Sequence, residues 1–205
     1  MNTEELEQGS DEWHKARLGK PTASAASKLI TSTGARSKQL EAYAYKLAGE
    51  RYSGRSLDEW EGNKYTDRGT ELEPEARAAY EIKYNVDVIE KGFMTDKSDS
   101  YGMSPDGLIG EDGLLEIKCL PVGHIPAILY YNKHKKPPSD RIAQVQFQLL
   151  VSGRKWCDLW FYQPGLPSLR IRVDSHKAYQ SDLELYISEA IRIRDETILV
   201  LNEFK

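Results

Sequence analysis

Residues 104–118, SPDGLIGEDGLLEIK, constrain the fold of this chain more than any other segment. Two short apolar stretches meet at the bend GEDG, a pattern that predicts two antiparallel strands joined by a turn. Side chains alternate along a strand, so Leu115 faces one side of the second strand while Glu116 and Lys118 face the other. The same bend places Asp106 within about one residue of Glu116 across the strand pair.

The charged side of this hairpin allows two interpretations. In the first, a solvent-exposed hairpin turns its charges toward water, and the short motif taken alone is better explained in this way. In the second, Asp106 and Glu116 share a face, which requires a register that pairs them almost directly or a bulge that re-aims one of them. Two carboxylates so close repel each other unless a cation lies between them. Mg²⁺, with Mn²⁺ as a substitute, suits such a pair.

The second interpretation also gives roles to the neighbouring groups. The backbone carbonyl of Ile117 would complete the ligand shell of the metal. The ammonium of Lys118 would orient a metal-bound water or stabilise charge on the attacked phosphorus. Because a bound metal lowers the pKa of its water, the chemistry indicated is hydrolysis of a phosphodiester.

The hydrophobic periodicity of the rest of the chain predicts helices first and a sheet in the middle. The expected helices cover residues 11–18, 23–30 with Thr22 as N-cap, 38–51, and 68–84 with Pro74 near the first turn. Two more are expected over 140–153, between an N-cap at Ser139 and an end at Gly153, and from an N-cap at Ser175 through residues 183–201.

Short apolar runs bounded by turn residues predict the strands. An antiparallel meander is expected over residues 86–95, 101–110 and 114–120, followed by strands over 156–163 and 168–174. The order of elements predicts an α/β fold, with a central mixed β-sheet flanked by α-helices and a helical N-terminal region.

Composition agrees with one globular domain over residues 1–205. The chain has 205 residues, 40% of them hydrophobic, which is enough to build a core. No apolar run approaches the roughly 20 residues of a membrane span, and the polar N-terminus does not resemble a signal peptide. Two cysteines are too few for a disulfide framework. We therefore expect a reduced, cytoplasmic protein.

The charges are unevenly distributed along the chain. A net charge of −4 taken alone argues against a nucleic-acid partner, yet six Lys and Arg residues and no acid lie between Glu12 and Glu41. A second basic cluster covers residues 134–141, while acidic residues gather at 71–75 and 106–116. A basic surface around an acidic pocket suits a metal-dependent enzyme that acts on polyphosphate, although ordinary solvated faces explain each cluster singly.

Four segments together resemble a known nuclease family. PDGLIGEDGLLEIK resembles the active-site signature of the PD-(D/E)xK nucleases. The segments EQGSDEWHKARLGKPTAS, RGTELEPEARAAYE and IAQVQFQLLV resemble, in the same order, those of the lambda exonuclease family, the YqaJ-like phage recombinases. The resemblance covers nearly the whole chain, from Glu7 into the last helix, and it implies a PD-(D/E)xK nuclease core.

The resemblance assigns catalytic roles to five residues. Asp106 and Glu116 match the metal-binding carboxylates and Lys118 matches the catalytic lysine. Glu73 matches a glutamate near the metal and the nucleophilic water, and Gln144 matches an active-site glutamine. Without the resemblance, Glu73 reads as an acidic residue at a solvated helix start, and Gln144 as part of an amphipathic helix face that it shares with Gln148.

The resemblance also implies a site for the 5′ phosphate of the DNA strand being degraded. Arg17 matches an arginine that holds this phosphate, and Ser24 matches a second contact near a helix N-terminus. Ser104 offers another hydroxyl. Trp13 braces Arg17, stacks on a base or packs in the core, and a surface charge remains the alternative for Arg17. Further candidate DNA contacts, argued from charge alone, are Lys135 and Lys136.

The function implied by the resemblance is exonuclease digestion of the 5′-ended strand of linear double-stranded DNA. The 3′ single-stranded tail would pass to a phage single-strand-annealing recombinase in the bacterial cytoplasm. The family also implies a ring-shaped homotrimer and two Mg²⁺ ions per active site. No P-loop is present, so ATP is not expected to take part. Two alternatives stay open: an endonuclease or nickase of the same superfamily, and a non-catalytic DNA-binding or scaffold protein.

Overall fold

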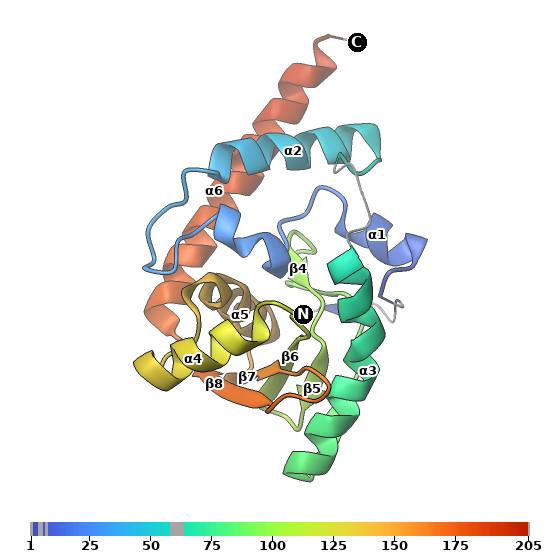
Figure 1. The fold of residues 1–205 in the computed structure, drawn as a ribbon. Coiled ribbons are helices and arrows are strands. Elements are labelled where there is room, and N and C mark those ends of the chain that lie inside the picture. The colour runs from blue at the N-terminus through green and yellow to red at the C-terminus, as the bar shows by residue number, and fades with distance from the viewer. Residues whose placement is uncertain (1, 4–5, 7, 58–63, 205) are drawn as a thin grey trace.

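The computed structural model describes residues 2–3, 6, 8–57 and 64–204 (Figure 1). Its centre is a five-stranded mixed sheet in the order β2-β5-β6-β7-β8. These strands are β2 (Val88–Ile89), β5 (Gly107–Ile109), β6 (Gly113–Lys118), β7 (Trp156–Phe161) and β8 (Leu169–Asp174). A smaller sheet, in the order β1-β3-β4, consists of β1 (Asn2–Thr3), β3 (Met94–Thr95) and β4 (Gly102–Met103). The predicted mixed sheet is therefore present.

The helices lie on both sides of the five-stranded sheet. They are α1 (Asp11–Arg17), the 3₁₀ helix η1 (Ala23–Lys28), α2 (Leu40–Ser53), α3 (Lys64–Tyr84), α4 (His124–His134), α5 (Ser139–Ser152) and α6 (Lys177–Asn202). The main core packs α5, η1, α2 and α6 on one side of the sheet, and a second cluster packs α3 on the other. Within the described residues, none of these helices is long and apolar enough to span a membrane.

The hairpin within residues 104–118 has the register needed for a shared face. Gly107 of β5 pairs with Leu115 of β6, so the next pair outward places Asp106 opposite Glu116. Leu115 packs in the cluster under α3, so Glu116 points to the other side, toward α5. Glu116 is only 2% exposed. The hairpin is therefore not a solvent-facing one.

The predicted meander divides between the two sheets. β2 and β5 pair antiparallel, as do β5 and β6, but β3 and β4 pair with each other in the smaller sheet. Residues 104–106 consequently run from β4 in one sheet to β5 in the other. All these strands have the same short apolar pattern, so the sequence alone does not tell which strand belongs to which sheet.

Two predicted helix starts are wrong because other groups satisfy the backbone. The segment after Thr22 is a 3₁₀ helix, and the Thr22 hydroxyl makes no capping bond but lies 3.3 Å from the Ser24 hydroxyl. The last helix begins at Lys177, one residue later than the expected N-cap at Ser175 implies, because its N-cap is His176. The His176 Nδ1 atom accepts a hydrogen bond from the Tyr179 N–H at 3.0 Å.

Three further differences between the predicted and the observed helices concern α3, α5 and α4. Pro74 lies inside α3, which begins at Lys64, and the packing of the later turns offsets the one backbone hydrogen bond that proline removes. Pro138 occupies the N-cap of α5, and Ser139 is its first residue; Gly153 ends the helix in the left-handed conformation, as expected. Helix α4 is absent from the predicted elements, and it supplies part of the crossover between the parallel strands β6 and β7.

Candidate active site

Glu116 lies at the centre of a buried cluster of polar side chains. Lys118, two residues along the same strand face, donates to Oε1 of Glu116 at 2.5 Å. Helix α5 contributes two amides one turn apart: Gln144 donates to Oε1 at 2.7 Å and Gln148 donates to Oε2 at 2.5 Å. Both oxygens of Glu116 are thus held in place. The predicted residues Glu116, Lys118 and Gln144 come together, and Gln148 belongs with them.

Asp106 lies beside this cluster, at the end of the connection between the two sheets. Its Oδ2 atom accepts a hydrogen bond from the Ile117 N–H at 2.6 Å, which fixes the carboxylate against β6. Burial, reinforced by the Glu116 and Glu73 carboxylates, raises the pKa of Asp106 well above its ordinary value. Crowded, buried carboxylates of this kind are stabilised when a cation neutralises them.

Glu73 reaches the same region from α3. Its side chain accepts from Arg77 at 2.8 Å, and Arg77 also donates to the backbone carbonyl of Asp106 at 3.1 Å. The pKa of Glu73 is raised by burial and by Glu116, while Arg77 opposes the shift. Arg77 therefore links the helix that bears Glu73 to the residue that precedes β5. The spacing of Glu73 and Arg77 predicts their ion pair, but only the fold reveals the contact with Asp106.

Lys118 keeps its positive charge in this setting. Burial alone lowers the pKa of its ammonium, but Glu116 and Asp106 raise it, and the net result lies above the ordinary value. A lysine in this state acts as a fixed positive charge and hydrogen-bond donor, and it does not serve as a base at neutral pH.

A second cluster joins three segments that are distant in the sequence. Arg17 at the end of α1 donates to the hydroxyl of Ser104 at 3.3 Å and to the hydroxyl of Ser24 at 3.2 Å. The indole of Trp13 donates to Ser104 at 2.8 Å, and the Arg17 guanidinium lies 3.9 Å from the centre of the Trp13 ring. Trp13 therefore contacts Arg17 as a brace would, and its stacking on a DNA base stays a prediction.

The Arg17 guanidinium is set up to receive an anion. Burial lowers its pKa to about 10, so it stays protonated at neutral pH although it is poorly hydrated. Among the described residues, its hydrogen-bond partners are the neutral hydroxyls of Ser104 and Ser24, and no carboxylate forms an ion pair with it. A partly buried guanidinium flanked by hydroxyls suits a phosphate group, which accepts paired N–H donors.

The two clusters are joined by the chain itself. Ser104 belongs to the Arg17 cluster and Asp106 to the carboxylate cluster, and only Pro105 separates them. Their Cα atoms therefore lie within about 7.6 Å of each other. A pocket of about 510 Å³ opens beside this connection, lined by residues that include Glu73, Arg77 and Asp106.

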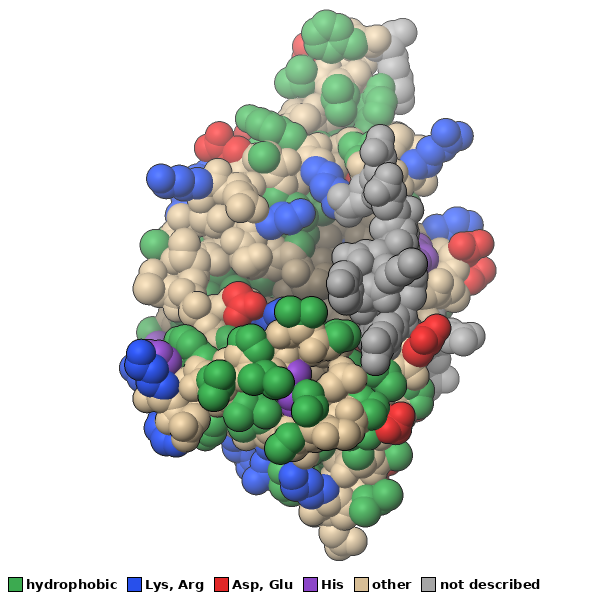
Figure 2. Space-filling model, viewed as in Figure 1, with side chains coloured by type: hydrophobic (Ala, Val, Ile, Leu, Met, Phe, Trp, Pro, Cys, Tyr) green, Lys and Arg blue, Asp and Glu red, His purple; other side chains and the backbone are tan. Residues whose placement is uncertain are grey.

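Lys135 and Lys136 are not brought to either cluster. They follow α4, where Lys135 donates to the side chain of Asn132 at 3.2 Å and Lys136 is exposed. On the face of the molecule seen in Figure 2, apolar side chains gather below a hollow. The exposed apolar residues of α4 include Ile125 and Leu129. A DNA contact by Lys135 and Lys136 stays a prediction.

The residues present fit a divalent metal of the magnesium type. In the part of the chain that the structure describes, no three Asp, Glu, His or Cys side chains form a ready ligand group. The available set is instead the opposed pair Asp106 and Glu116 next to the backbone of Ile117. Mg²⁺ is commonly bound by one or two carboxylates and completes its shell with water and substrate phosphate, so this sparse set is appropriate.

Comparison with known proteins identifies the family. Residues 12–155 match the model of the YqaJ-like viral recombinase domain, a span that contains every residue of the two clusters. The chain belongs to the YqaJ-like viral recombinase family. The predicted membership is thus confirmed, and no curated protein matches the chain.

Solved structures agree with the family and the fold. The alkaline exonuclease LHK-Exo from Laribacter hongkongensis is 34% identical, with a TM-score of 0.83, over 95% of this chain and 97% of that protein. The same enzyme in complex with dAMP matches with a TM-score of 0.82 at the same identity and coverage. A phage-related exonuclease from Haemophilus somnus shares the fold at 15% identity, with a TM-score of 0.71 over 89% of this chain and 96% of that one.

Proposed function

We propose that this chain is a metal-dependent exonuclease that digests the 5′-ended strand of linear duplex DNA and leaves a 3′ single-stranded tail. One observation carries the proposal. Residues 104–106 connect the arginine cluster, which has no carboxylate partner among the described residues, to the buried carboxylate pair. Family membership supports a nuclease in phage recombination. The complex of LHK-Exo with dAMP, a deoxynucleoside monophosphate, agrees with a site that accepts nucleotides.

The arrangement gives each cluster a distinct task. Arg17, Ser24 and Ser104 hold the 5′ terminal phosphate and so fix the position of the strand end. Asp106 and Glu116, with the carbonyl of Ile117, would hold Mg²⁺. When bound, the ion polarises the phosphate and makes an attacking water more acidic. The family resemblance implies two such ions.

The remaining residues of the carboxylate cluster orient groups and stabilise charge. Gln144 and Gln148 hold both oxygens of Glu116, so the carboxylate does not rotate away from its neighbour Asp106. The charged Lys118 stabilises negative charge that develops on the phosphate during attack. Glu73 adds a further carboxylate at the edge of the site, where it orients water.

We further propose that the chain works as a ring-shaped homotrimer and passes its product to a single-strand-annealing recombinase. The family resemblance supports both proposals. Sedimentation equilibrium of the purified protein tests the first: a mass three times that of the 23.3 kDa chain is expected, and a monomer would contradict it.

The decisive experiment follows linear duplex DNA labelled separately at each 5′ and each 3′ end, with Mg²⁺ and with a chelator. Release of label from 5′ ends before 3′ ends, only with Mg²⁺, is the expected result. Covalently closed circular DNA of the same sequence should remain intact. Cutting of the circle would favour an endonuclease or nickase, and absence of any product with DNA still bound would favour a non-catalytic binding protein.

A further inference from the structure

The position of Arg17 is only partly explained by its own helix. Trp13 of α1 braces the guanidinium and donates to Ser104, but no residue of this seven-residue helix is fully buried. Its side-chain contacts with Ser104 and Ser24 are the same ones that a phosphate would replace or share. A residue that recognises the terminal phosphate must be held rigidly, because a misplacement of about 1 Å costs about 10²-fold in rate. The C-terminal end of α1 must therefore be anchored by other parts of the chain.

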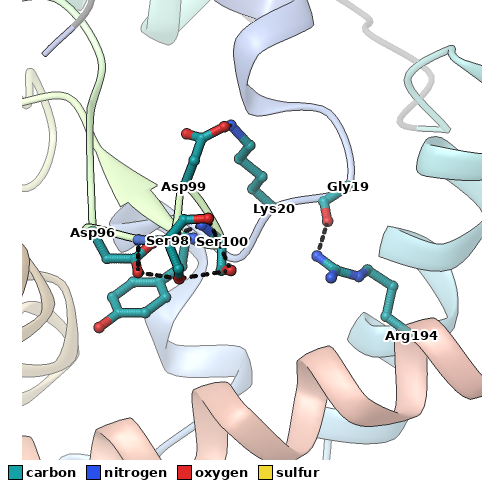
Figure 3. Close-up of polar contacts among 8 residues, drawn as sticks. Gly19, Lys20, Asp96, Ser98, Asp99, Ser100 and Arg194 are labelled. Carbon is teal, nitrogen blue, oxygen red and sulfur yellow. Dashed lines mark hydrogen bonds and ion pairs between the residues drawn. The ribbon is translucent and has the colours of Figure 1, made fainter. Parts of the chain in front are cut away.

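Gly19, two residues after Arg17, is fixed on every side. Its φ of +66° is in the left-handed region, and a Cβ added there would lie 2.6 Å from the Cβ of Arg51 in α2. Its N–H donates to Oε2 of Glu50 at 3.3 Å, and its carbonyl accepts from Nη1 of Arg194 at 2.8 Å. Figure 3 shows Arg194 extending from α6 to this carbonyl.

Glu50 and Arg194 are charged residues in unusually buried places. Glu50 is 6% exposed and Arg194 is 3% exposed. Burial of a charge is costly unless hydrogen bonds compensate for it. Arg194 donates to the exposed Asp195 at 2.7 Å, and Glu50 pairs with Lys46 at 3.4 Å. Both Glu50 and Arg194 also bond the backbone of Gly19. We call Glu50, Gly19 and Arg194 the Gly19 clamp.

The chain stays anchored beyond the clamp until it reaches Ser24. Lys20 forms an ion pair with Asp99 at 2.7 Å, as Figure 3 shows. The Thr22 N–H donates to the hydroxyl of Tyr43 at 3.2 Å. The segment between Arg17 and Ser24 is thus held by α2, by α6 and by the turn between β3 and β4, while α1 itself lies on the surface.

We propose that Glu50 and Arg194 are positioning residues that act through Gly19 to hold Arg17 in register with the 5′ phosphate. The proposal rests on the proposed function for the role of Arg17, and it extends the determinants of end recognition to two residues that touch no substrate. Helix α6, from the C-terminal part of the chain, thereby takes part in reading the DNA end.

Arg194→Met tests the proposal, with Arg192→Met as the matched control. Arg192 lies on the exposed side of the same helix, where it pairs with Glu196. The readout is the ratio of digestion rates on 5′-phosphorylated and 5′-hydroxyl duplex ends. Arg194→Met should lower this ratio about tenfold or more, and Arg192→Met should leave it unchanged. An unchanged ratio in Arg194→Met, whether the two rates stay the same or fall equally, would overturn the proposal.

A pair of substitutions at Glu50 covers the case in which Arg194→Met fails to fold. Glu50→Gln keeps an oxygen that accepts from Gly19, whereas Glu50→Met removes it, and both remove the charge. The ratio should be retained in the first variant and reduced in the second. Equal ratios in these two variants would show that the bond to Gly19 does not matter. In a background of Arg17→Ala, neither Glu50→Met nor Arg194→Met should change the ratio further.

Hydrogen–deuterium exchange separates failure of the clamp from failure of the proposed function. In the free protein, Arg194→Met should speed exchange over residues 15–22 and leave α2 and α6 protected. Unchanged exchange over 15–22 would overturn the clamp, whatever the enzyme does to DNA. A wild-type enzyme that digests both kinds of end equally would instead contradict the proposed role of Arg17.

Discussion

Lys118 is the side chain whose removal should separate catalysis from binding. Its ammonium bonds Glu116 and stays charged, whereas the proposed contacts with the phosphate end belong to the Arg17 cluster. We expect Lys118→Ala to lose DNA digestion by at least about 10²-fold while its affinity for DNA ends is retained. Digestion is measured with Mg²⁺ on linear duplex, and binding is measured in chelator. Wild-type digestion by this variant would contradict the role assigned to Lys118.

Arg17 should matter most when the DNA end has a phosphate. Its guanidinium has hydroxyl partners and a braced position, but no carboxylate among the described residues forms an ion pair with it. Arg17→Ala should therefore slow digestion of 5′-phosphorylated ends strongly and that of 5′-hydroxyl ends little. Rates on the two ends, measured side by side, check this. An equal loss on both would make Arg17 a general electrostatic or structural residue.

Asp106 should destabilise the metal-free protein at neutral pH. Burial, with Glu116 and Glu73, raises its pKa in the folded state, so the folded protein keeps a proton that the unfolded chain loses at about pH 4. The free energy of unfolding therefore falls as the pH rises through the window between the two pKa values. Asp106→Asn removes the charge but keeps an oxygen for the Ile117 N–H.

The expected result is a variant that is inactive but more stable. In chelator at neutral pH, the Tm of Asp106→Asn should exceed that of the wild type by several degrees. The gap should close toward about pH 3, where Asp106 of the wild type is protonated in both the folded and the unfolded state. Mg²⁺ should raise the Tm of the wild type more than that of the variant. Equal Tm values in chelator at neutral pH would count against mutual repulsion at this site.

The side chains of the site differ in how far the sequence could reveal them. Asp106, Glu116 and Lys118 belong to one hairpin, and local register alone brings them together. Gln148 shares a helix face with Gln144, but periodicity cannot show that both amides bond the same carboxylate. Arg194 is not identifiable from the sequence, since its partner Gly19 lies at the opposite end of the chain.

Helix α3 depends on a few polar bonds for its place against the sheet. Tyr80 donates to the fully buried Asp158 of β7 at 2.6 Å, and the indole of Trp160 donates to the carbonyl of Ala76 at 3.0 Å. Tyr80→Phe removes one bond to a charged group and should lower the free energy of unfolding by about 1.5–3 kcal/mol. Thermal unfolding measures the loss. Activity per folded molecule should remain, because the Tyr80 hydroxyl bonds Asp158, which belongs to neither cluster; a specific loss of activity would contradict this.

The helices and strands were predictable wherever periodicity decides them. The strands 156–163 and 168–174 and the helices α2 and α5 follow apolar spacing closely. Helix α4 was missed because a proline in its first turn and several exposed apolar residues hide any amphipathic pattern. The N-cap of α6 was misplaced by one residue, from His176 to Ser175, because a histidine ring is a rare cap; here it accepts from the Tyr179 N–H.

Across the molecule, the short distance between Ser104 and Asp106 leads to a prediction about the size of the product. Ser104 and Asp106 lie within about 7.6 Å, and each strand of duplex DNA rises about 3.4 Å per nucleotide. We expect each cut to release about one or two nucleotides from the 5′ end. Chromatography of the products from the first turnovers checks this. Release of longer oligonucleotides would mean that the Arg17 cluster and the carboxylate pair do not act on the same strand end.

The fold and the carboxylate cluster were within reach of the sequence, whereas the connection between the sheets was not. A mixed sheet follows from the order of elements, but the placement of β3 and β4 in a separate sheet depends on tertiary packing. That placement is what brings Ser104 to Arg17 while Asp106 stays at the edge of β5.

The lone Pro105 between Ser104 and Asp106 has a consequence for the evolution of chain length. An insertion at this point would move the residue that contacts Arg17 away from the residue that faces Glu116, so both could not keep their places. The exposed connection around 134–138, between α4 and α5, contains no residue of either cluster and is under no such restriction. Among related sequences, insertions and deletions should therefore accumulate in that connection and be absent from 104–106.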